Sequence, residues 1–307
     1  MQNRRGIAFG VAAYGIWGLF PLYWPLLKPA QPLEILAHRI MWSLVAVLAI
    51  LAVRRHWGWL RTLTLKQAGL LALAATVISV NWGTYIYGVN SGHTIETALG
   101  YFITPLINVM FGVLLFRERM RPAQWTAIGL GALAVVVLTA DYGRPPWIAL
   151  TLAASFGTYS LVKKYVSMPS AESLTVETTV LFVPALIFAI SLQAGGTASF
   201  GHHGAGHVLL LAAAGVITAV PLMLFNAAAI RIPMSTMGML QYLAPVLQFL
   251  IGLLVLREPM PASRWIGFVL VWAALLVFTT DGLRTARRNR LRLPVLPVPA
   301  QPVRETT

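Results

Sequence analysis

Three ionisable residues stand together in an otherwise apolar stretch of the sequence: Glu34, His38 and Arg39. Glu34 and His38 are four residues apart, so on a helix they would share one face. Arg39 would lie on a neighbouring face, about 7 Å along the axis from Glu34. Such a group could bind a polar substrate or relay protons, because the pKa of histidine lies near neutral pH. A helix-packing network is the alternative interpretation.

Glu96 is a second candidate, at the start of a later apolar segment and three residues after His93. A carboxylate at a helix N-terminus is stabilised by the helix dipole. We expect Glu96 to pair with Arg39 or to contact substrate, and capping of its own helix is the alternative. Glu177 begins another apolar segment, and we expect it to act in proton coupling or gating together with Glu34 and His38.

Two further sets of residues share one spacing, in which a polar side chain, a proline and an amide stand at i, i+4 and i+7. The sets are Tyr101, Pro105 and Asn108, and Gln241, Pro245 and Gln248. A proline inside a helix frees a backbone carbonyl, which a membrane tolerates only beside a cavity or a neighbour. We expect these faces, with Tyr242 beside Gln241, to form opposite walls of a substrate cavity. Interhelical hydrogen bonding is the alternative.

Aromatic residues extend this candidate site. Trp82 and Tyr85 are three residues apart and could stack on a planar or cationic substrate, although packing in lipid or core would also explain either residue alone. His202, His203 and His207 could bind a metal, but a solvated loop is the stronger interpretation, so we expect neither metal nor cofactor. The sequence contains no phosphate-binding loop for ATP, and no serine-hydrolase or zinc-protease signature.

Composition places these residues in a membrane. Hydrophobic residues make up 58% of the 307-residue chain and charged residues only 10%, against about 25% in soluble domains. The net charge of +14 lies mostly in short gaps between apolar runs, which indicates membrane topology rather than nucleic-acid binding. Cysteine is absent, which excludes disulfides and thiolate-bound metals.

Ten apolar segments are long enough to cross a bilayer. They cover residues 6–27, 32–53, 67–89, 93–116, 122–140, 146–163, 173–193, 206–230, 233–256 and 261–280. With both termini in the cytoplasm, the inner gaps and tails carry 18 Lys and Arg and the outer gaps four, as the positive-inside rule requires. This distribution predicts a multi-pass protein of the cell inner membrane. Residues 284–307 are basic and Pro-rich and should form a disordered tail near lipid headgroups.

An internal repeat divides the chain. A shift of 140 residues aligns the fourth and fifth segments with the ninth and tenth. The matched residues of the first copy are Pro105, Gly112, Leu114, Arg117, Glu118, Met120, Trp125, Leu130, Ala134, Val137, Thr139 and Asp141. The repeats therefore cover residues 1–141 and 142–283, with five segments each. Since five is odd, the copies must cross the membrane in opposite senses, and inverted repeats of this kind commonly enclose a transport site.

Several short motifs together resemble the RarD family, in the EamA-fold branch of the drug/metabolite transporter superfamily. They are AAYGIWG at 12–18, EILAHR at 34–39, NW at 81–82, ALGYFITPLIN at 98–108, RE at 117–118 and QYLAP at 241–245. The resemblance covers the chain to about residue 285. It implies an all-α membrane fold of ten transmembrane helices in two inverted five-helix EamA-like repeats, a central cavity between them, cytoplasmic termini and secondary transport, usually export.

The residues and the resemblance together predict a secondary transporter that exports a small metabolite or drug by alternating access and is driven by a proton gradient. A membrane-embedded enzyme or a channel is the alternative, but no activated nucleophile accompanies Glu34 and His38, so we expect no enzyme activity. The expected partners are a small-molecule substrate and membrane lipids, with no nucleic acid. A homodimer is left open.

Overall fold

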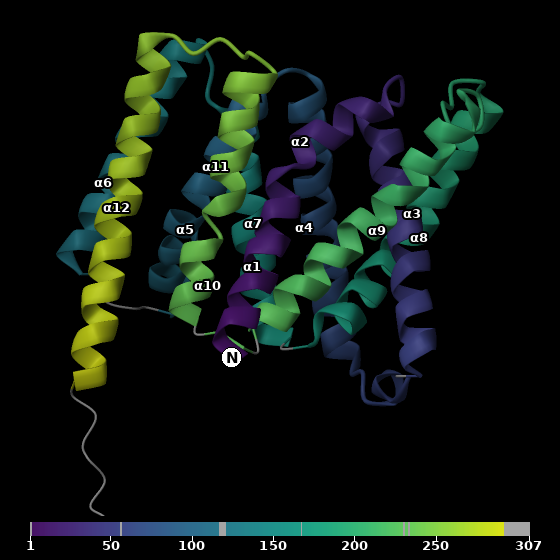
Figure 1. Cartoon of the computed structure of the whole chain (residues 1–307), viewed down its shortest axis with the longest axis horizontal. Helices are drawn as coiled ribbons and strands as arrows, with labels where there is room; N and C mark the ends of the chain where they lie inside the picture. Colours follow the sequence, from purple (N-terminus) through teal and green to yellow (C-terminus); the bar gives the residue numbers. More distant parts are fainter. Residues whose placement is uncertain are drawn as a thin grey trace, which may run out of the picture.

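The computed structural model describes residues 2–55, 57–116, 121–166, 168–229, 231–232 and 234–291. Across these residues every regular element is helical (Figure 1). The elements are α1 (Gln2–Gly18), α2 (Phe20–Tyr23), η1 (Trp24–Leu27), α3 (Pro32–Arg54), η2 (Gly58–Arg61), α4 (Leu65–Asn90), α5 (Thr94–Phe116), α6 (Pro122–Tyr142), α7 (Trp147–Val166), α8 (Ser170–Ala194), α9 (Gly204–Ala229), α10 (Met234–Leu240), α11 (Leu243–Leu250), the π-helix η3 (Ile251–Val255) and α12 (Ala262–Leu291).

Two of the expected segments are broken, and proline accounts for the position of each break. The first segment is divided into α1, α2 and η1, with Pro21 and Pro25 at the starts of the two short helices. The ninth segment turns at residues 241–242 between α10 and α11. Pro245 cannot donate a hydrogen bond to the carbonyl of Gln241, four residues earlier, so the helix ends there. Pro105, at the equivalent position of the first repeat, lies inside the unbroken α5.

Seven helices are long and apolar enough to cross a membrane, counted over the described part of the chain. They comprise residues 4–27, 32–54, 65–90, 122–142, 171–194, 204–225 and 262–285. A multi-pass membrane fold follows, while the three other expected segments fall on α5, α7 and the broken α10–α11–η3. The number ten therefore stays a prediction.

The prediction of a disordered tail from residue 284 is wrong for its first part, because α12 continues to Leu291. Residues 284–291 contain neither proline nor glycine, and arginine is a good helix former. Residues 292–307 lie outside the described residues, as do Arg117, Glu118 and Met120 of the repeat.

The two repeats pack into each other rather than side by side. The first element of each repeat packs on the third element of the other repeat, as α1 does on α9 and α7 on α4. The second element of each repeat also packs on the third element of the other, as α3 does on α9 and α8 on α4. Like elements also meet, as α3 with α8, α5 with α11 and α6 with α12. This reciprocal pattern is the one that a two-fold relation between the repeats produces.

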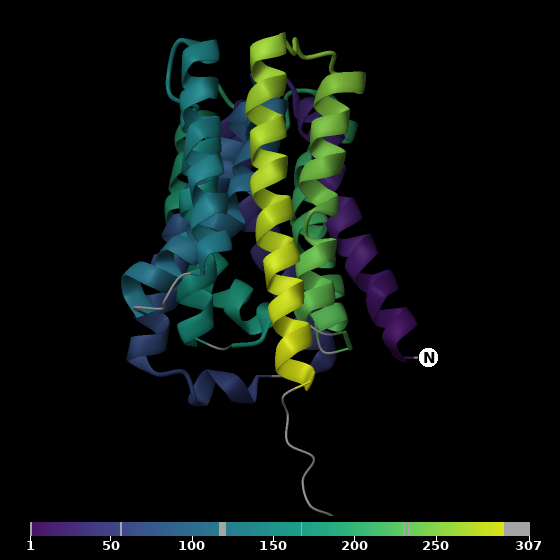
Figure 2. The same cartoon turned by 90° about the vertical axis from the view of Figure 1, so that its left-hand side faces the viewer.

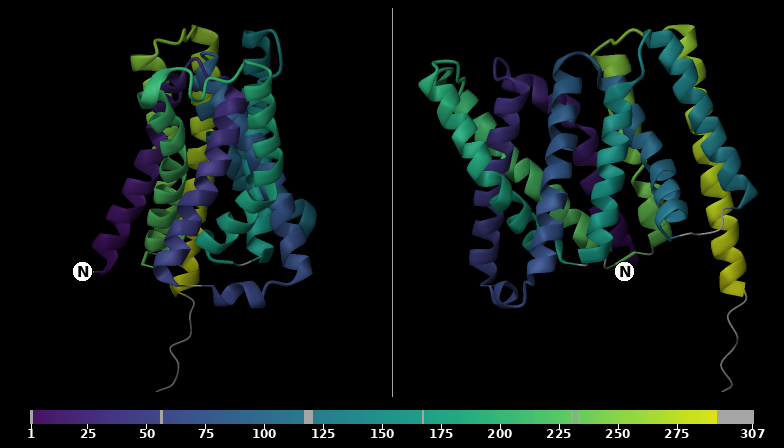
Figure 3. Two further views of the ribbon diagram at one scale, coloured as in Figure 1. Left: turned by 90° about the vertical axis from the view of Figure 1, so that its right-hand side faces the viewer. Right: turned by 180° about the vertical axis from the view of Figure 1, so that it is seen from behind.

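The pair α6 and α12 shows the opposed directions of the repeats most directly. Both helices lie at one edge of the bundle (Figures 1 and 3) and stand in front in Figure 2. Asp141 at the end of α6 pairs with Arg264 at the start of α12, at 2.9 Å between Oδ2 and Nε. Asp281 near the end of α12 pairs with Arg121 just before α6, at 2.8 Å. The two aspartates are equivalent in the repeat, so the helices are antiparallel.

The start of α1 and the end of α12 lie at the same end of the bundle (Figure 1). We call this the near end and the opposite one, which carries the loops after η1, α4, α6, α8 and η3, the far end. The site described next lies among α1–η1, α3, α4 and α9.

Candidate functional site

Arg39 is the buried cation at the centre of the candidate site. It lies two turns into α3, and only 3% of its side chain is exposed. Its Nε donates a hydrogen bond of 3.0 Å to Oγ1 of Thr218 on α9, and that hydroxyl donates to the carbonyl of Ala214. The guanidinium is thereby anchored between the two repeats.

Three aromatic rings surround the same guanidinium. Its Cζ lies 4.0 Å from the ring centroid of Trp82, 5.1 Å from that of Trp24 and 5.7 Å from that of Phe20. Cation–π contacts of this kind contribute about 0.5–2 kcal/mol each, more where water is excluded. The rings thus offset part of the cost of an intramembrane charge, which insertion scales put at about 2.5–3.5 kcal/mol.

Tyr85 and Tyr101 continue the aromatic wall, with ring centroids 5.7 Å apart. The Tyr101 hydroxyl donates to Oδ1 of Asn81 at 3.1 Å. Nδ2 of Asn81 donates in turn to the Leu152 carbonyl and to Oγ of Ser155, both at 3.0 Å. This network ties α4 and α5 to α7 and fixes Tyr101, whereas the buried hydroxyl of Tyr85 has no hydrogen-bond partner among the described residues.

Glu34 and His38 lie beside Arg39 but face the far-end loop between α8 and α9. The Glu34 carboxylate accepts hydrogen bonds from the backbone N–H groups of Ser199 and Phe200, at 2.7 and 3.1 Å. The His38 ring stacks on Phe200, with centroids 4.4 Å apart, and its buried Nδ1 has no partner among the described residues. These two residues bind α3 to the loop between α8 and α9.

His207 departs from the expectation of a solvated loop. It lies on α9 with 7% of its surface exposed, and its Nε2 is 2.9 Å from the carbonyl of Leu27. The contact joins α9 to η1, which explains why the residue is buried.

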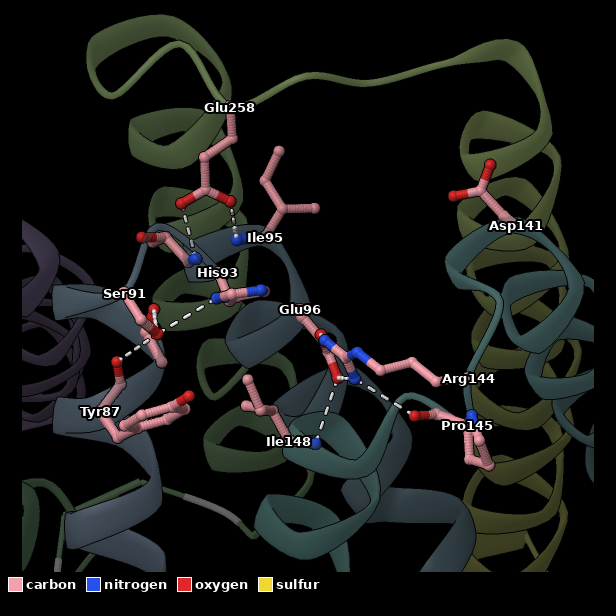
Figure 4. Close-up of polar contacts among 12 residues, drawn as sticks. Tyr87, Ser91, His93, Ile95, Glu96, Asp141, Arg144, Pro145, Ile148 and Glu258 are labelled. Atoms are coloured by element: carbon pink, nitrogen blue, oxygen red, sulfur yellow. Dashed lines mark hydrogen bonds and ion pairs between the residues drawn. The ribbon is translucent and has the colours of Figure 1, made fainter.

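Glu96 does not pair with Arg39, so that prediction is wrong. Its carboxylate binds Arg144 through both oxygens, at 2.9 and 3.3 Å, and accepts a 3.1 Å hydrogen bond from the backbone N–H of Ile148 (Figure 4). Ile148 is in the first turn of α7, so Glu96 caps that helix rather than its own. The hydrogen bond to Glu96 raises the pKa of Arg144, which lies in the loop before α7.

Glu258 caps the N-terminus of α5. Its two carboxylate oxygens accept hydrogen bonds from the backbone N–H groups of Thr94 and Ile95, at 2.6 and 2.9 Å (Figure 4). Glu258 follows η3, so a loop of the second repeat caps a helix of the first. Glu258 is the repeat equivalent of Glu118, and nothing in the sequence predicted that it would cap α5.

Glu177 lies at the near end, away from Arg39. It forms an ion pair of 2.9 Å with Lys163 and accepts hydrogen bonds from Ser173 at 2.7 Å and Tyr159 at 3.2 Å. The carboxylate is 1% exposed and therefore links α7 to α8 from inside the bundle.

The two proline-centred faces are less uniform than the spacing predicts. Asn108 and Gln241 are exposed, and Tyr242 packs on the hydrophobic cluster around Phe249 and Phe268. Gln248 is buried, and its Nε2 donates to the Trp17 carbonyl at 3.1 Å. Of these residues, Tyr101 is part of the Arg39 site, because its ring contacts that of Tyr85.

Sequence reasoning missed Phe20, Trp24 and Thr218. Phe20 and Trp24 are four residues apart, the spacing that places side chains on one helix face, so their periodicity was a usable signal. Thr218 is a single hydroxyl residue in an apolar run, so the sequence gave no signal for its role.

Comparison with known proteins places this architecture in a class. The model of the EamA-like transporter family matches residues 4–140 and 145–280. A protein from Streptomyces exfoliatus named Protein RarD is 58% identical over 95% of this chain and 93% of its own. The Escherichia coli Protein RarD is 38% identical over 94% and 98%. An uncharacterized transporter of Pseudomonas aeruginosa is 42% identical over 93% and 96%.

A crystal structure of a protein 20% identical in sequence has a TM-score of 0.56 and covers 90% of this chain and 97% of that one; it supports the fold alone. Fold and relatives together define a multi-pass membrane transporter and not an enzyme. The chain belongs to the EamA-like transporter family, in its RarD branch.

Proposed function

We propose that this protein is a secondary transporter that exports a small metabolite or drug across the inner membrane by alternating access. Ten spans in two inverted repeats would enclose the substrate cavity, with both termini in the cytoplasm. The charge distribution of the sequence and the antiparallel pairing of α6 with α12 support this arrangement.

The Arg39 site is the observation on which the proposal chiefly rests. A buried guanidinium between the repeats is costly in a membrane, and such residues typically mark substrate or ion pathways. Here it is held by α3 of one repeat and α9 of the other, and aromatic rings surround it. Motion of one repeat relative to the other would change the contacts of Arg39 with α9.

A proton gradient is the drive that we propose. Of the three residues expected to act in proton coupling or gating, Glu34 and Glu177 accept hydrogen bonds from the protein. His38 differs, since its Nδ1 is buried without a partner among the described residues. His38 is therefore the residue that we assign to proton coupling.

Transport by the purified full-length protein in proteoliposomes tests the proposal. A thermal-shift screen against amino acids, nucleosides, organic cations and amphenicols selects the compounds. Chloramphenicol belongs in the panel because a Pseudomonas aeruginosa relative, 28% identical, is named a chloramphenicol-sensitive protein.

Saturable uptake that shows counterflow, and that responds to an imposed pH gradient, is the result expected. Flux that rises linearly with concentration would support a channel instead. Saturable counterflow that does not respond to the pH gradient would support a carrier and contradict proton coupling.

A further inference from the structure

Three hydrogen-bond donors around Arg39 are buried without partners among the described residues. They are Nη1 of Arg39, Nε1 of Trp24 and the hydroxyl of Tyr85. Trp24 lies against the guanidinium, and Tyr85 belongs to the same hydrophobic cluster as Trp24. Buried donors are nearly always satisfied in a finished structure, so this group points to an acceptor supplied from outside the protein.

Six carboxylates in the described part of the chain are engaged away from Arg39. They are Glu34, Glu96, Asp141, Glu177, Glu258 and Asp281. Nor does the structure give Arg39 an ion pair among the described residues, although Arg121, Arg144, Lys163 and Arg264 each have one. Among the described residues, the contacts of the guanidinium are therefore a neutral hydroxyl and three ring faces, with no ion pair.

If the role of Arg39 were purely structural, we would expect more of its N–H groups to donate hydrogen bonds within the protein. Arginine has five N–H donors, and in packing networks they bind carboxylates or carbonyls as a fork. In this site Nε donates to Thr218, whereas Nη1 has no partner among the described residues. The Thr218 contact orients the guanidinium and leaves Nη1 for a ligand.

From this geometry we propose that the transported substrate is a small organic anion whose carboxylate is bound by Arg39, next to an apolar body that packs on the aromatic rings. The inference rests on the proposed transport function and names its substrate class. A carboxylate accepts two parallel hydrogen bonds from a guanidinium and supplies the missing negative charge. Trp24 and Tyr85 can donate to its remaining lone pairs.

Three matched probes of nearly equal size test the inference: 3-phenylpropanoate, its primary amide 3-phenylpropanamide, and 3-phenylpropylamine. At neutral pH they are anionic, neutral and cationic. We expect the carboxylate to raise the melting temperature of the purified full-length protein, because a ligand that binds only the folded state stabilises it. The amide and the amine should bind at least about tenfold more weakly. Equal shifts from all three, or none from the carboxylate, would overturn the inference.

Variants locate the binding. Arg39→Gln should weaken 3-phenylpropanoate binding about tenfold or more and remove the preference for it over the amide. Arg264→Gln is the matched control, since it removes an arginine that pairs with Asp141 on α6, and it should keep that preference. Retention of the preference in Arg39→Gln would overturn the inference. The probe series on the unsubstituted protein decides the matter even if Arg39→Gln fails to fold.

The same probes in proteoliposomes separate this inference from the transport proposal. Saturable counterflow of the amide or the amine, without that of the carboxylate, would contradict the substrate class and leave a transporter. Arg39-dependent binding of the carboxylate without any movement across the membrane would contradict the transport proposal.

Discussion

At the scale of the residue, Arg39 is positioned by contacts from both repeats. Thr218 of α9 fixes its Nε, while Trp82 of α4 and Trp24 of η1 cover the guanidinium. These neighbours explain how the charge can be buried, but they leave its Nη1 without a hydrogen bond. The role that we assign to Arg39 is therefore one of binding rather than of holding the fold together.

Arg39→Ala should reduce counterflow to background while the protein still inserts and folds, because the substitution removes the charge that binds substrate. Counterflow in proteoliposomes, matched for protein content and size-exclusion profile, measures the effect. Arg54→Ala, an exposed arginine in the last turn of the same helix, is the control and should transport normally. Unchanged transport by well-folded Arg39→Ala would remove Arg39 from the mechanism.

Glu96 and Arg144 provide a contrasting pair with a structural role. Glu96→Gln should lower stability by about 1–3 kcal/mol, since it weakens a charged hydrogen bond and the cap of α7; the 35% exposure of the Arg144 side chain keeps the loss below that of a fully buried pair. Thermal unfolding of Glu96→Gln, Arg144→Gln and the double variant measures the coupling. Additive losses in the double variant would show that the two residues do not interact.

At the scale of the element, Gly215 determines how closely α9 approaches α3. A Cβ atom at this position would lie 2.2 Å from the backbone carbon and oxygen of Trp42, and 2.7 Å from the Ser43 nitrogen. Backbone atoms cannot rotate away as a side chain can, so any larger residue must separate the helices. Gly215 is three residues before Thr218, so the same separation would withdraw Thr218 from Arg39.

Gly215→Ala should therefore lower the melting temperature and also weaken transport. Gly129→Ala is the matched control, because a Cβ there meets no atom within 4 Å; alanine should be neutral or stabilise α6 by about 0.5–1 kcal/mol. Circular dichroism melts of both variants in detergent make the comparison. Equal melting temperatures for the two variants would contradict the close contact of α3 with α9.

The helices could be predicted well from the sequence because their signals are local. The expected segments 67–89 and 122–140 correspond to α4 and α6, and a capping box of Thr64 with Gln67 marks the start of α4. The break before Pro245 also has a local cause, but the intact α5 shows that an equivalent proline does not always break a helix. Whether such a proline breaks its helix was therefore not predictable from the local sequence.

The site could be predicted only in part, for the same reason. Arg39, Trp82 and Tyr85 were identified from type and spacing, and the structure brings them together or near one another. Partner choice was not predictable: Glu34 binds backbone more than 160 positions away, and Glu96 binds Arg144 instead of Arg39. These contacts depend on how the two repeats interlock, which one sequence without its fold does not determine.

At the scale of the whole molecule, the account depends on two repeats that cross the membrane in opposite senses. Reciprocal packing of the repeats and the antiparallel α6 and α12 agree with this. Arg39 then lies where the repeats meet, and a change in their relative tilt would open it to one side or the other. Parallel repeats would give no such alternation.

Cysteine labelling tests the inverted arrangement most directly, because the natural chain has no cysteine. Pro122 and Ala262 are equivalent in the repeat, exposed, and the first residues of α6 and α12. In intact cells, a membrane-impermeant maleimide should label Ala262→Cys, whereas Pro122→Cys should react only after the inner membrane is opened. Labelling of both cysteines from the same side would contradict the inverted repeats and the alternating-access mechanism built on them.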